Sequence, residues 1–185
     1  MLFVYPISIR QHTGSAILCC TTERIIGVGE RITLEEALQR RSALREQGKR
    51  LVFTNGHFDL LHVGHLDYLE KARALGAALF VGINGDPTTE LLKGTGRPIV
   101  PAVERARLVA ALVPVTAAII FHEPTADALI AALQPDIYVK GGDYRGKLLP
   151  ERETVEAYGG SVVLIDYLPD HSTSALIARI KALPD

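Results

Sequence analysis

Short apolar runs alternate with helical segments through most of this 185-residue chain. From residue 50 onward the runs that we predict to be strands are Leu51–Thr54, Leu79–Ile83, Ala118–Phe121, Ile137–Val139 and Val162–Ile165. Between them, helices are predicted near Val63–Leu75, Val103–Leu112, Thr125–Leu133, Glu151–Ala157 and Ser174–Ala182. Strands that are apolar throughout and separated by helices indicate a parallel sheet covered on both faces. We therefore expect an α/β fold with a doubly wound, mostly parallel, five-stranded sheet.

The chain is long enough for one α/β domain with its own core, and residues 31–185 are expected to form it. Thr33 and Glu36 make a capping-box pattern, which predicts a helix over Leu34–Gln47 with Gly48 as its stop. Residues 1–30 lack clear periodicity and are assigned to an N-terminal extension. A β-rich extension, a disordered arm and an artificial start are alternatives that the sequence leaves open.

The composition excludes several classes of partner. The net charge of −1 gives no global field that would attract nucleic acid or an anionic membrane, so any anion site must be local. No apolar run reaches the roughly 18 residues of a membrane span. The two cysteines, Cys19 and Cys20, are adjacent and provide no spaced disulfide framework. We expect a cytoplasmic protein that binds neither nucleic acid nor membrane.

In a doubly wound sheet, ligands bind at the carboxyl ends of the strands. The loop after the first predicted strand contains His62 and His65, which lie three residues apart where a helix is predicted to begin. At that spacing the two side chains share one face of the helix. A helix N-terminus offers free N–H groups to anions, and Gly64 lets a phosphate approach the backbone closely. This loop therefore predicts a polyphosphate site.

Two other interpretations of the histidines stay open. In the first, one of the two imidazole rings packs in the core and the other is exposed to solvent, and neither has a function. In the second, His57, His62 and His65 bind a metal, although no cysteine lies near them. The sequence has no G-x-x-x-x-G-K-[ST] loop and no G-x-G-x-x-G after a strand. Without these motifs, the sequence gives no main support for nucleotide hydrolysis by a P-loop enzyme or for redox chemistry with a dinucleotide cofactor.

Residues 56–65 have the sequence GHFDLLHVGH, which resembles the G-x-F-D-x-x-H-x-G-H signature of the HxGH nucleotidyltransferase superfamily. Later segments resemble its heptose 1-phosphate adenylyltransferase branch, namely NGD at 84–86, LKG at 92–94, RP at 97–98 and KGGDY at 140–144. Residues 172–174 stand where that branch has S-T-T opening its last helix. The resemblance covers about residues 31–182 and implies a Rossmann-like nucleotidyltransferase fold.

The resemblance implies that the chain transfers AMP from ATP to a sugar 1-phosphate and releases pyrophosphate. His62, His65 and Lys93 would be catalytic. Nucleotide binding falls to Thr54, Asn55, Gly56, Phe58, Asp59, Gly64, Lys140, Gly141, Gly142, Asp143, Ser172, Thr173 and Ser174, and substrate binding to Asn84, Asp86, Lys93 and Arg97. Mg²⁺ would bridge the triphosphate with few protein ligands, so no metal site of the chain's own is expected. Relatives imply a homodimer by analogy.

Several of these residues also have structural interpretations. Lys93 and Arg97 are expected in a glycine-flanked loop, where two cations suit a triphosphate or a sugar phosphate but also suit a solvated surface. Ser172 is a candidate N-cap, and Asp86 a candidate cap of the turn before Pro87.

Position 57 is His, where the family often has Cys or Val, and an imidazole near the nucleotide site is expected to affect base or metal selectivity. Two alternative functions also stay open. One is cytidylyl transfer to glycerol 3-phosphate or a similar alcohol phosphate, and the other is non-catalytic nucleotide binding.

Overall fold

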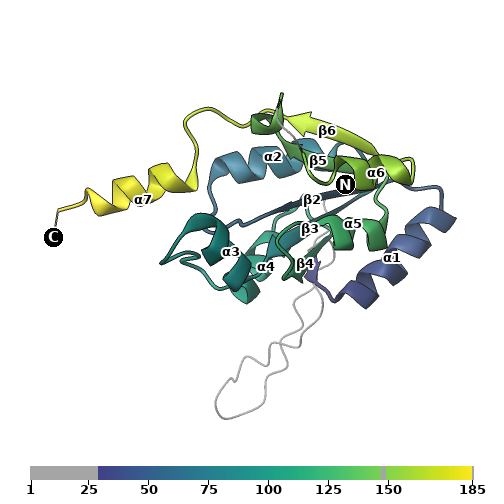
Figure 1. Ribbon diagram of the computed structural model, residues 1–185, viewed down its shortest axis with the longest axis horizontal. Coiled ribbons are helices and arrows are strands. Elements are labelled where there is room, and N and C mark those ends of the chain that lie inside the picture. Colours follow the sequence, from purple (N-terminus) through teal and green to yellow (C-terminus); the bar gives the residue numbers. More distant parts are fainter. Residues whose placement is uncertain (1–28, 147–148, 185) are drawn as a thin grey trace, which may run out of the picture.

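A computed structural model gives the fold and describes residues 29–146 and 149–184 (Figure 1). Of the predicted extension, residues 1–28 lie outside this range, as does the side chain of Asp143. The elements follow in the order β1 (Glu30–Arg31), α1 (Leu34–Glu46), β2 (Leu51–Gly56), α2 (Val63–Arg73), β3 (Ala78–Asn84), α3 (Asp86–Lys93), α4 (Ala102–Ala110), β4 (Ala117–Phe121), α5 (Asp127–Leu133), β5 (Ile137–Gly141), the short 3₁₀ helix η1 (Gly142–Tyr144), α6 (Arg152–Ala157), β6 (Ser161–Ile165) and α7 (Thr173–Lys181).

Within the described residues the sheet has six strands, all parallel, in the order β1-β4-β3-β2-β5-β6. From β2 the chain winds outward through β3 and β4, and it then crosses to β5 and β6 on the other side of β2. The topological switch point therefore lies between β2 and β5, where ligands of doubly wound sheets bind.

The two faces of the sheet are covered by different helices, as Figure 1 shows for α2 on one side and α1 and α5 on the other. Successive strand residues point to opposite faces, so Phe53 and Val52 belong to two separate cores. Toward α1, α5 and α6 the core contains Leu51, Phe53, Phe80, Ile119, Ile130 and Val155. Toward α2 and α4 it contains Val52, Leu69, Leu79, Val81, Val109 and Val139. The predicted doubly wound α/β class is confirmed.

Two details of the prediction were wrong. The sheet has a sixth strand because β1 adds two residues to the edge at β4, and a pairing that short leaves no periodicity in the sequence. The predicted loop 84–98 contains the helix α3, with Pro87 in its first turn and Gly94 (φ 91°) at its end. Leu91 and Leu92 of this helix are exposed, so it lacks a buried stripe that would mark it. Lys93 is thus the last residue of a helix.

Both predicted helix starts that carry caps are confirmed. Thr33 and Glu36 form the capping box of α1, with the Glu36 N–H donating to Thr33 Oγ1 over 3.2 Å. Ser172 caps α7, since its Oγ accepts from the Ala175 N–H over 3.1 Å. The helix α7 itself extends away from the sheet, at the opposite end of the molecule from α1 (Figure 1), and none of its residues is buried. Of the described helices, none has the length and apolar character needed to cross a lipid bilayer.

Candidate active site

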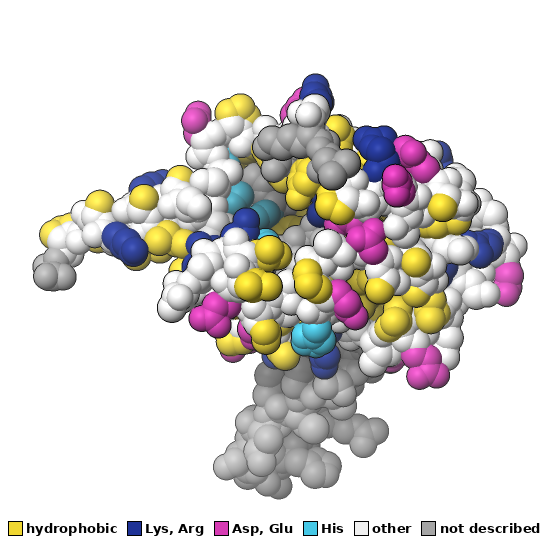
Figure 2. All heavy atoms as spheres, in the orientation of Figure 1, with side chains coloured by type: hydrophobic (Ala, Val, Ile, Leu, Met, Phe, Trp, Pro, Cys, Tyr) yellow, Lys and Arg dark blue, Asp and Glu magenta, His cyan; other side chains and the backbone are white. Residues whose placement is uncertain are grey.

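A cavity of about 580 Å³ lies where β2 and β5 end, at the switch point of the sheet. Its walls come from the β2–α2 loop, the end of α3, the end of β5, the last residue of η1 and the segment that leads into α7. Figure 2 shows histidine side chains in a hollow beside α7, with basic side chains next to them. The size and the convergence of polar groups are those of a small-molecule site.

Most of the residues predicted from the sequence meet in this cavity. Those that line it are Asn55, Gly56, Phe58, Asp59, His62, Gly64, His65, Asn84, Lys93, Arg97, Lys140, Gly141, Ser172, Thr173 and Ser174. Thr54, Asp86 and Gly142 do not line it. Thr54 is fully buried between β3 and β5, and its hydroxyl lies 2.7 Å from the Tyr68 hydroxyl and donates to the Val139 carbonyl over 2.9 Å, so its side chain is not available to a ligand.

The β2–α2 loop brings the two signature histidines together. Phe58 adopts a left-handed backbone (φ 47°), a conformation that is uncommon for a bulky residue and is found at functional sites. Its ring lies 5.2 Å from the His65 ring. His62 is the N-cap of α2, and its ring stacks on His65 with centroids 3.9 Å apart and 25° between the planes. The predicted sharing of one helix face is confirmed.

Both signature imidazoles are neutral near pH 7. Burial, followed by the neighbouring His62, lowers the pKa of His65 to about 4. Burial and then the charge of His171 lower the pKa of His62. In the described structure both Nδ1 atoms are buried without a hydrogen-bond partner. A buried N–H without an acceptor is unfavourable, so the proton of each ring belongs on Nε2, which can donate to a phosphate oxygen.

Asp59 holds residues 97–100, which form part of the cavity wall, in place by hydrogen bonds. Its Oδ2 accepts from Arg97 Nε over 2.6 Å, and its Oδ1 accepts from the backbone N–H groups of Ile99 and Val100 over 2.8 and 2.9 Å. Burial alone would raise the pKa of this carboxyl, but the three hydrogen bonds outweigh it and lower the pKa. Because the Arg97 charge is already paired with Asp59, Arg97 supplies less free positive charge than the sequence suggested.

Arg105 connects several loops of the site by hydrogen bonds from its buried side chain. Its side chain is fully buried, and its guanidinium donates to the carbonyl of His57, to the carbonyl of Asn84 over 2.8 Å and to the carbonyl of Val100 over 2.7 Å. It also donates to Asp86 Oδ1 over 2.7 Å. Sequence reasoning missed Arg105. Its spacing from Ala102, Ala106 and Val109, which all lie on the buried face of α4, was a signal that could have found it.

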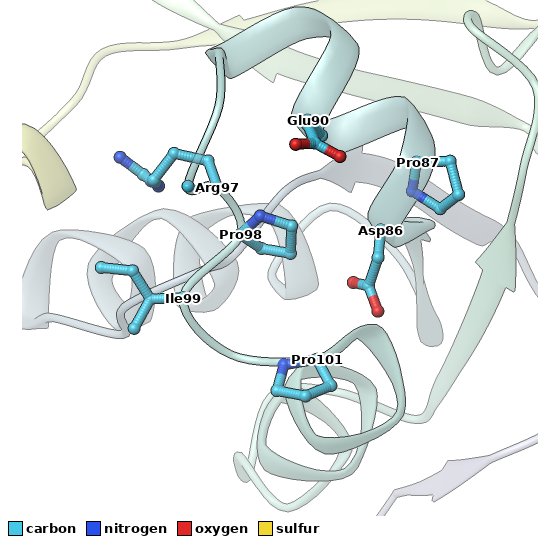
Figure 3. A pocket seen from close by; sticks show the side chains of 8 residues that line it. Asp86, Pro87, Glu90, Arg97, Pro98, Ile99 and Pro101 are labelled. Carbon is cyan, nitrogen blue, oxygen red and sulfur yellow. The ribbon is translucent and has the colours of Figure 1, made fainter.

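Asp86 faces a second cavity, of about 440 Å³, on the other side of the 97–100 segment. Figure 3 shows the carboxylates of Asp86 and Glu90 at this cavity and the Arg97 guanidinium directed away from both. Asp86 Oδ1 accepts from the N–H of Ala102, the first residue of α4, over 2.8 Å. The structure thus keeps Asp86 out of the larger cavity, shares the second cavity between Asp86 and Arg97, and gives Asp86 a capping contact.

Cations and aromatic rings flank the histidines. Lys140 is largely buried, and its Nζ lies 5.6 Å from the Tyr138 ring centroid and 5.4 Å from that of Tyr144, within cation–π range. Lys93 is exposed, and in the described part of the chain it has no ion-pair partner. These two amines therefore bring positive charge to the cavity from β5 and from α3.

Sequence reasoning also missed several lining residues. His57 was considered as a metal ligand and as a departure from the family near the nucleotide site, but it was given no defined role in binding. Glu151 was considered only as part of a helix, and it is in fact a buried carboxylate at the N-cap of α6. The remaining lining residues are Tyr68, Leu92, Pro124, Thr125, Tyr144, Pro150, Tyr167 and His171. A metal site from His57, His62 and His65 finds no support, because the described residues contain no group of three or more potential ligands that could hold an ion.

Comparisons with known proteins agree with this geometry. A protein of Geotalea uraniireducens named "Bifunctional protein HldE" is 49% identical over 139 residues, and its namesake in Alkalilimnicola ehrlichii is 44% identical over 154 residues. These alignments cover 75% and 83% of this chain but only 28% and 32% of the relatives, so the chain spans about three-tenths of their length.

Among solved structures, a lipopolysaccharide core biosynthesis protein from Thermoplasma volcanium has a TM-score of 0.55 and 28% identity, covering 65% of this chain and 98% of that one. A pantoate-beta-alanine ligase from Francisella tularensis has a TM-score of 0.54 at 12% identity, covering 83% and 77%, and it shares the fold alone. Residues 53–179 match the family described as cytidylyltransferase-like. The resemblance to the HxGH nucleotidyltransferases is thereby confirmed, and the chain belongs to the cytidylyltransferase-like family as an enzyme of the nucleotidyltransferase class.

Proposed function

We propose that this enzyme transfers AMP from ATP to the phosphate of a sugar 1-phosphate, namely a heptose 1-phosphate, and releases pyrophosphate. The observation that carries the proposal is the stacked pair of His62 and His65, which faces the same cavity as Lys93 and Lys140. The KGGDY run at 140–144 resembles the heptose branch of the family, and the relatives named HldE support the same branch.

The reaction is an in-line displacement at phosphorus. A phosphate oxygen of the sugar phosphate forms a bond to the α-phosphorus of ATP as the bond from that phosphorus to the β-phosphate oxygen breaks. The electron pair of the broken bond leaves with pyrophosphate. Because the attacking oxygen is already anionic near neutral pH, the reaction needs no general base, and the rate depends on alignment and charge stabilisation.

The side chains of the cavity suit that task. His62 and His65 donate from Nε2 to the phosphates of ATP, where negative charge develops as the bond breaks. Lys93 neutralises the acceptor phosphate or the α-phosphate, and Arg97 keeps a fixed position against Asp59. The free N–H groups at the start of α7, around Ser172–Ser174, add donors from a segment that contacts the β2–α2 loop at Leu60.

ATP enters this reaction as its Mg²⁺ complex, so the ion arrives as part of the substrate. The described side chains contain no cluster that could hold an ion by themselves, which fits an ion held mainly by the triphosphate. Mg²⁺ neutralises charge on the β- and γ-phosphates. By analogy with its relatives, the active form is proposed to be a homodimer, which light scattering of the purified protein would test.

A panel assay of pyrophosphate release tests the proposal. ATP and CTP are each combined with heptose 1-phosphate, with other sugar 1-phosphates and with glycerol 3-phosphate. We expect the highest kcat/KM for ATP with heptose 1-phosphate. A preference for CTP with glycerol 3-phosphate would contradict the proposal. Tight nucleotide binding without pyrophosphate release from any pair would instead indicate a non-catalytic binding protein.

A further inference from the structure

His57 stands in the wall of the cavity and is held there at two points. It directly follows the last residue of β2, and its ring Nδ1 lies 3.0 Å from Thr89 Oγ1. Thr89 is fully buried on α3, and the His57 carbonyl accepts a hydrogen bond from the buried Arg105. The imidazole is therefore a fixed part of the wall. Within the described residues, Nδ1 is the only ring nitrogen of His57 with a hydrogen-bond partner, which leaves Nε2 for a ligand.

The His57 ring is neutral beside two cations, as the rings of His62 and His65 are. Burial is the largest cause of a pKa lowered to about 4, and the charges of Lys93, Arg105, Lys140 and Arg97 add to it in that order. The ring is consequently neutral near pH 7, while Lys93 and Lys140 supply the positive charge of the same cavity. The cations suit phosphates. A neutral imidazole adds no charge and offers one directional hydrogen bond.

The tautomer of His57 narrows what Nε2 can bind. If the Thr89 hydroxyl donates to the Asn84 carbonyl, 3.4 Å away, it accepts from Nδ1–H and Nε2 is an acceptor. If the hydroxyl donates to Nδ1, then Nε2 carries the proton and is a donor. A phosphate oxygen accepts only, so it fits one of these states. A ligand hydroxyl both donates and accepts, so it fits either.

We propose that His57 is a specificity-determining residue that binds a hydroxyl group on the carbon skeleton of the acceptor through Nε2. This inference rests on the proposed function, because it concerns the sugar phosphate that accepts AMP. It assigns the phosphates to the lysines and to His62 and His65, whose Nδ1 atoms have no partner in the described structure, so that Nε2 is a donor. It assigns the sugar to His57, whose Nδ1 contacts the Thr89 hydroxyl, so that Nε2 is able to accept as well as donate. The substrate class is then a phosphate whose carbon skeleton carries a hydroxyl at the place that His57 reaches, since an acceptor without the hydroxyl loses this contact.

Binding measured without ATP tests the inference. Isothermal titration calorimetry with heptose 1-phosphate and its monodeoxy analogues compares the wild-type protein with His57→Val, His57→Asn and Thr89→Val. We expect one analogue to bind the wild type about 3–10-fold more weakly than the parent, the value of one neutral hydrogen bond. In His57→Val that ratio falls to about one. His57→Asn restores part of the ratio, and Thr89→Val, which frees the ring, gives an intermediate one. Circular dichroism checks that each variant is folded.

The outcomes separate this inference from the proposed function. If folded His57→Val keeps the wild-type ratio for every analogue, the role of His57 is overturned while adenylyl transfer stands. If calorimetry in two buffers shows proton uptake that His57→Val abolishes, the ring contacts phosphate as an imidazolium, and the hydroxyl role is overturned. Failure of every sugar phosphate in the panel to bind the wild type overturns both proposals.

Discussion

The two ends of the active site differ in how firmly the fold holds them. At the β2–α2 end, the fully buried Arg105 and the almost fully buried Asp59 bind the loops by several hydrogen bonds each. At the α7 end, the helix buries none of its residues, and its first residue is bonded to the β2–α2 loop from Thr173 Oγ1 to the Leu60 carbonyl over 3.2 Å. In the segment before α7, Asp166 accepts from the exposed Arg145 over 3.1 Å. The histidines are thus preorganised by the interior, whereas the α7 donors depend on a segment of low local stability.

Removing Arg105 should destabilise the β2–α2 end of the site, which we call the firm end because buried side chains hold it. Arg105→Met leaves the carbonyls of His57, Asn84 and Val100 without their buried donor. We expect the free energy of unfolding to fall by roughly 3–5 kcal/mol, the scale for removing one partner of a buried charged network. Urea denaturation measures this. Arg107→Met, an exposed position on the same helix, is the control and should change stability by less than about 0.5 kcal/mol. Equal stability of the two variants would show that the network does not hold the loops.

Removing His65 should leave the firm end folded but inactive. In His65→Ala the cavity loses one preorganised donor, so we expect kcat to fall by about 10²–10³-fold with little change in secondary structure. Steady-state kinetics with the best substrate pair measures the effect. His122→Ala, at a histidine outside the cavity lining, is the control. A folded His65→Ala protein with wild-type kcat would refute the role given to His65.

Removing the cap of α7 should affect only the loosely held end. Ser172→Ala deletes the acceptor of the Ala175 N–H, which is worth about 1 kcal/mol to a helix. Because α7 buries nothing, the loss should appear as faster hydrogen exchange in residues 173–181 and not as lower global stability. Ser174→Ala, which keeps the cap, is the control. A fall in global stability equal to the local one would mean that both ends unfold together.

The same contrast explains what the sequence could predict. Strands buried on both faces are continuous apolar runs, so their positions were found to within two residues, and the signature loop was readable because its parts are adjacent. Helical spacing could have placed Arg105 on the buried face of α4, but its bonds to the site loops and the place of Glu151 in the cavity wall depend on contacts across the fold, which no local pattern reports. α3 was missed because its apolar residues face solvent, and β1 because it is defined only by its pairing with β4.

The pH dependence of stability should also report on the firm end. His57 and His65 each have a folded-state pKa of about 4, below their ordinary value of 6.5. Between these values the unfolded chain binds more protons than the folded one, so stability is fully present above pH 6.5 and is lost as the pH falls toward 4. One pKa unit corresponds to about 1.4 kcal/mol, and partial exposure reduces this, so we expect a loss on the order of 1–2 kcal/mol between pH 7 and pH 4.5. The double variant His57→Gln/His65→Gln should lose less over the same window when urea denaturation is repeated at each pH. If the free energy of unfolding depends on pH in the same way in both proteins, the fold does not hold these imidazoles neutral. The β2–α2 end would then not differ from the α7 end in its electrostatics.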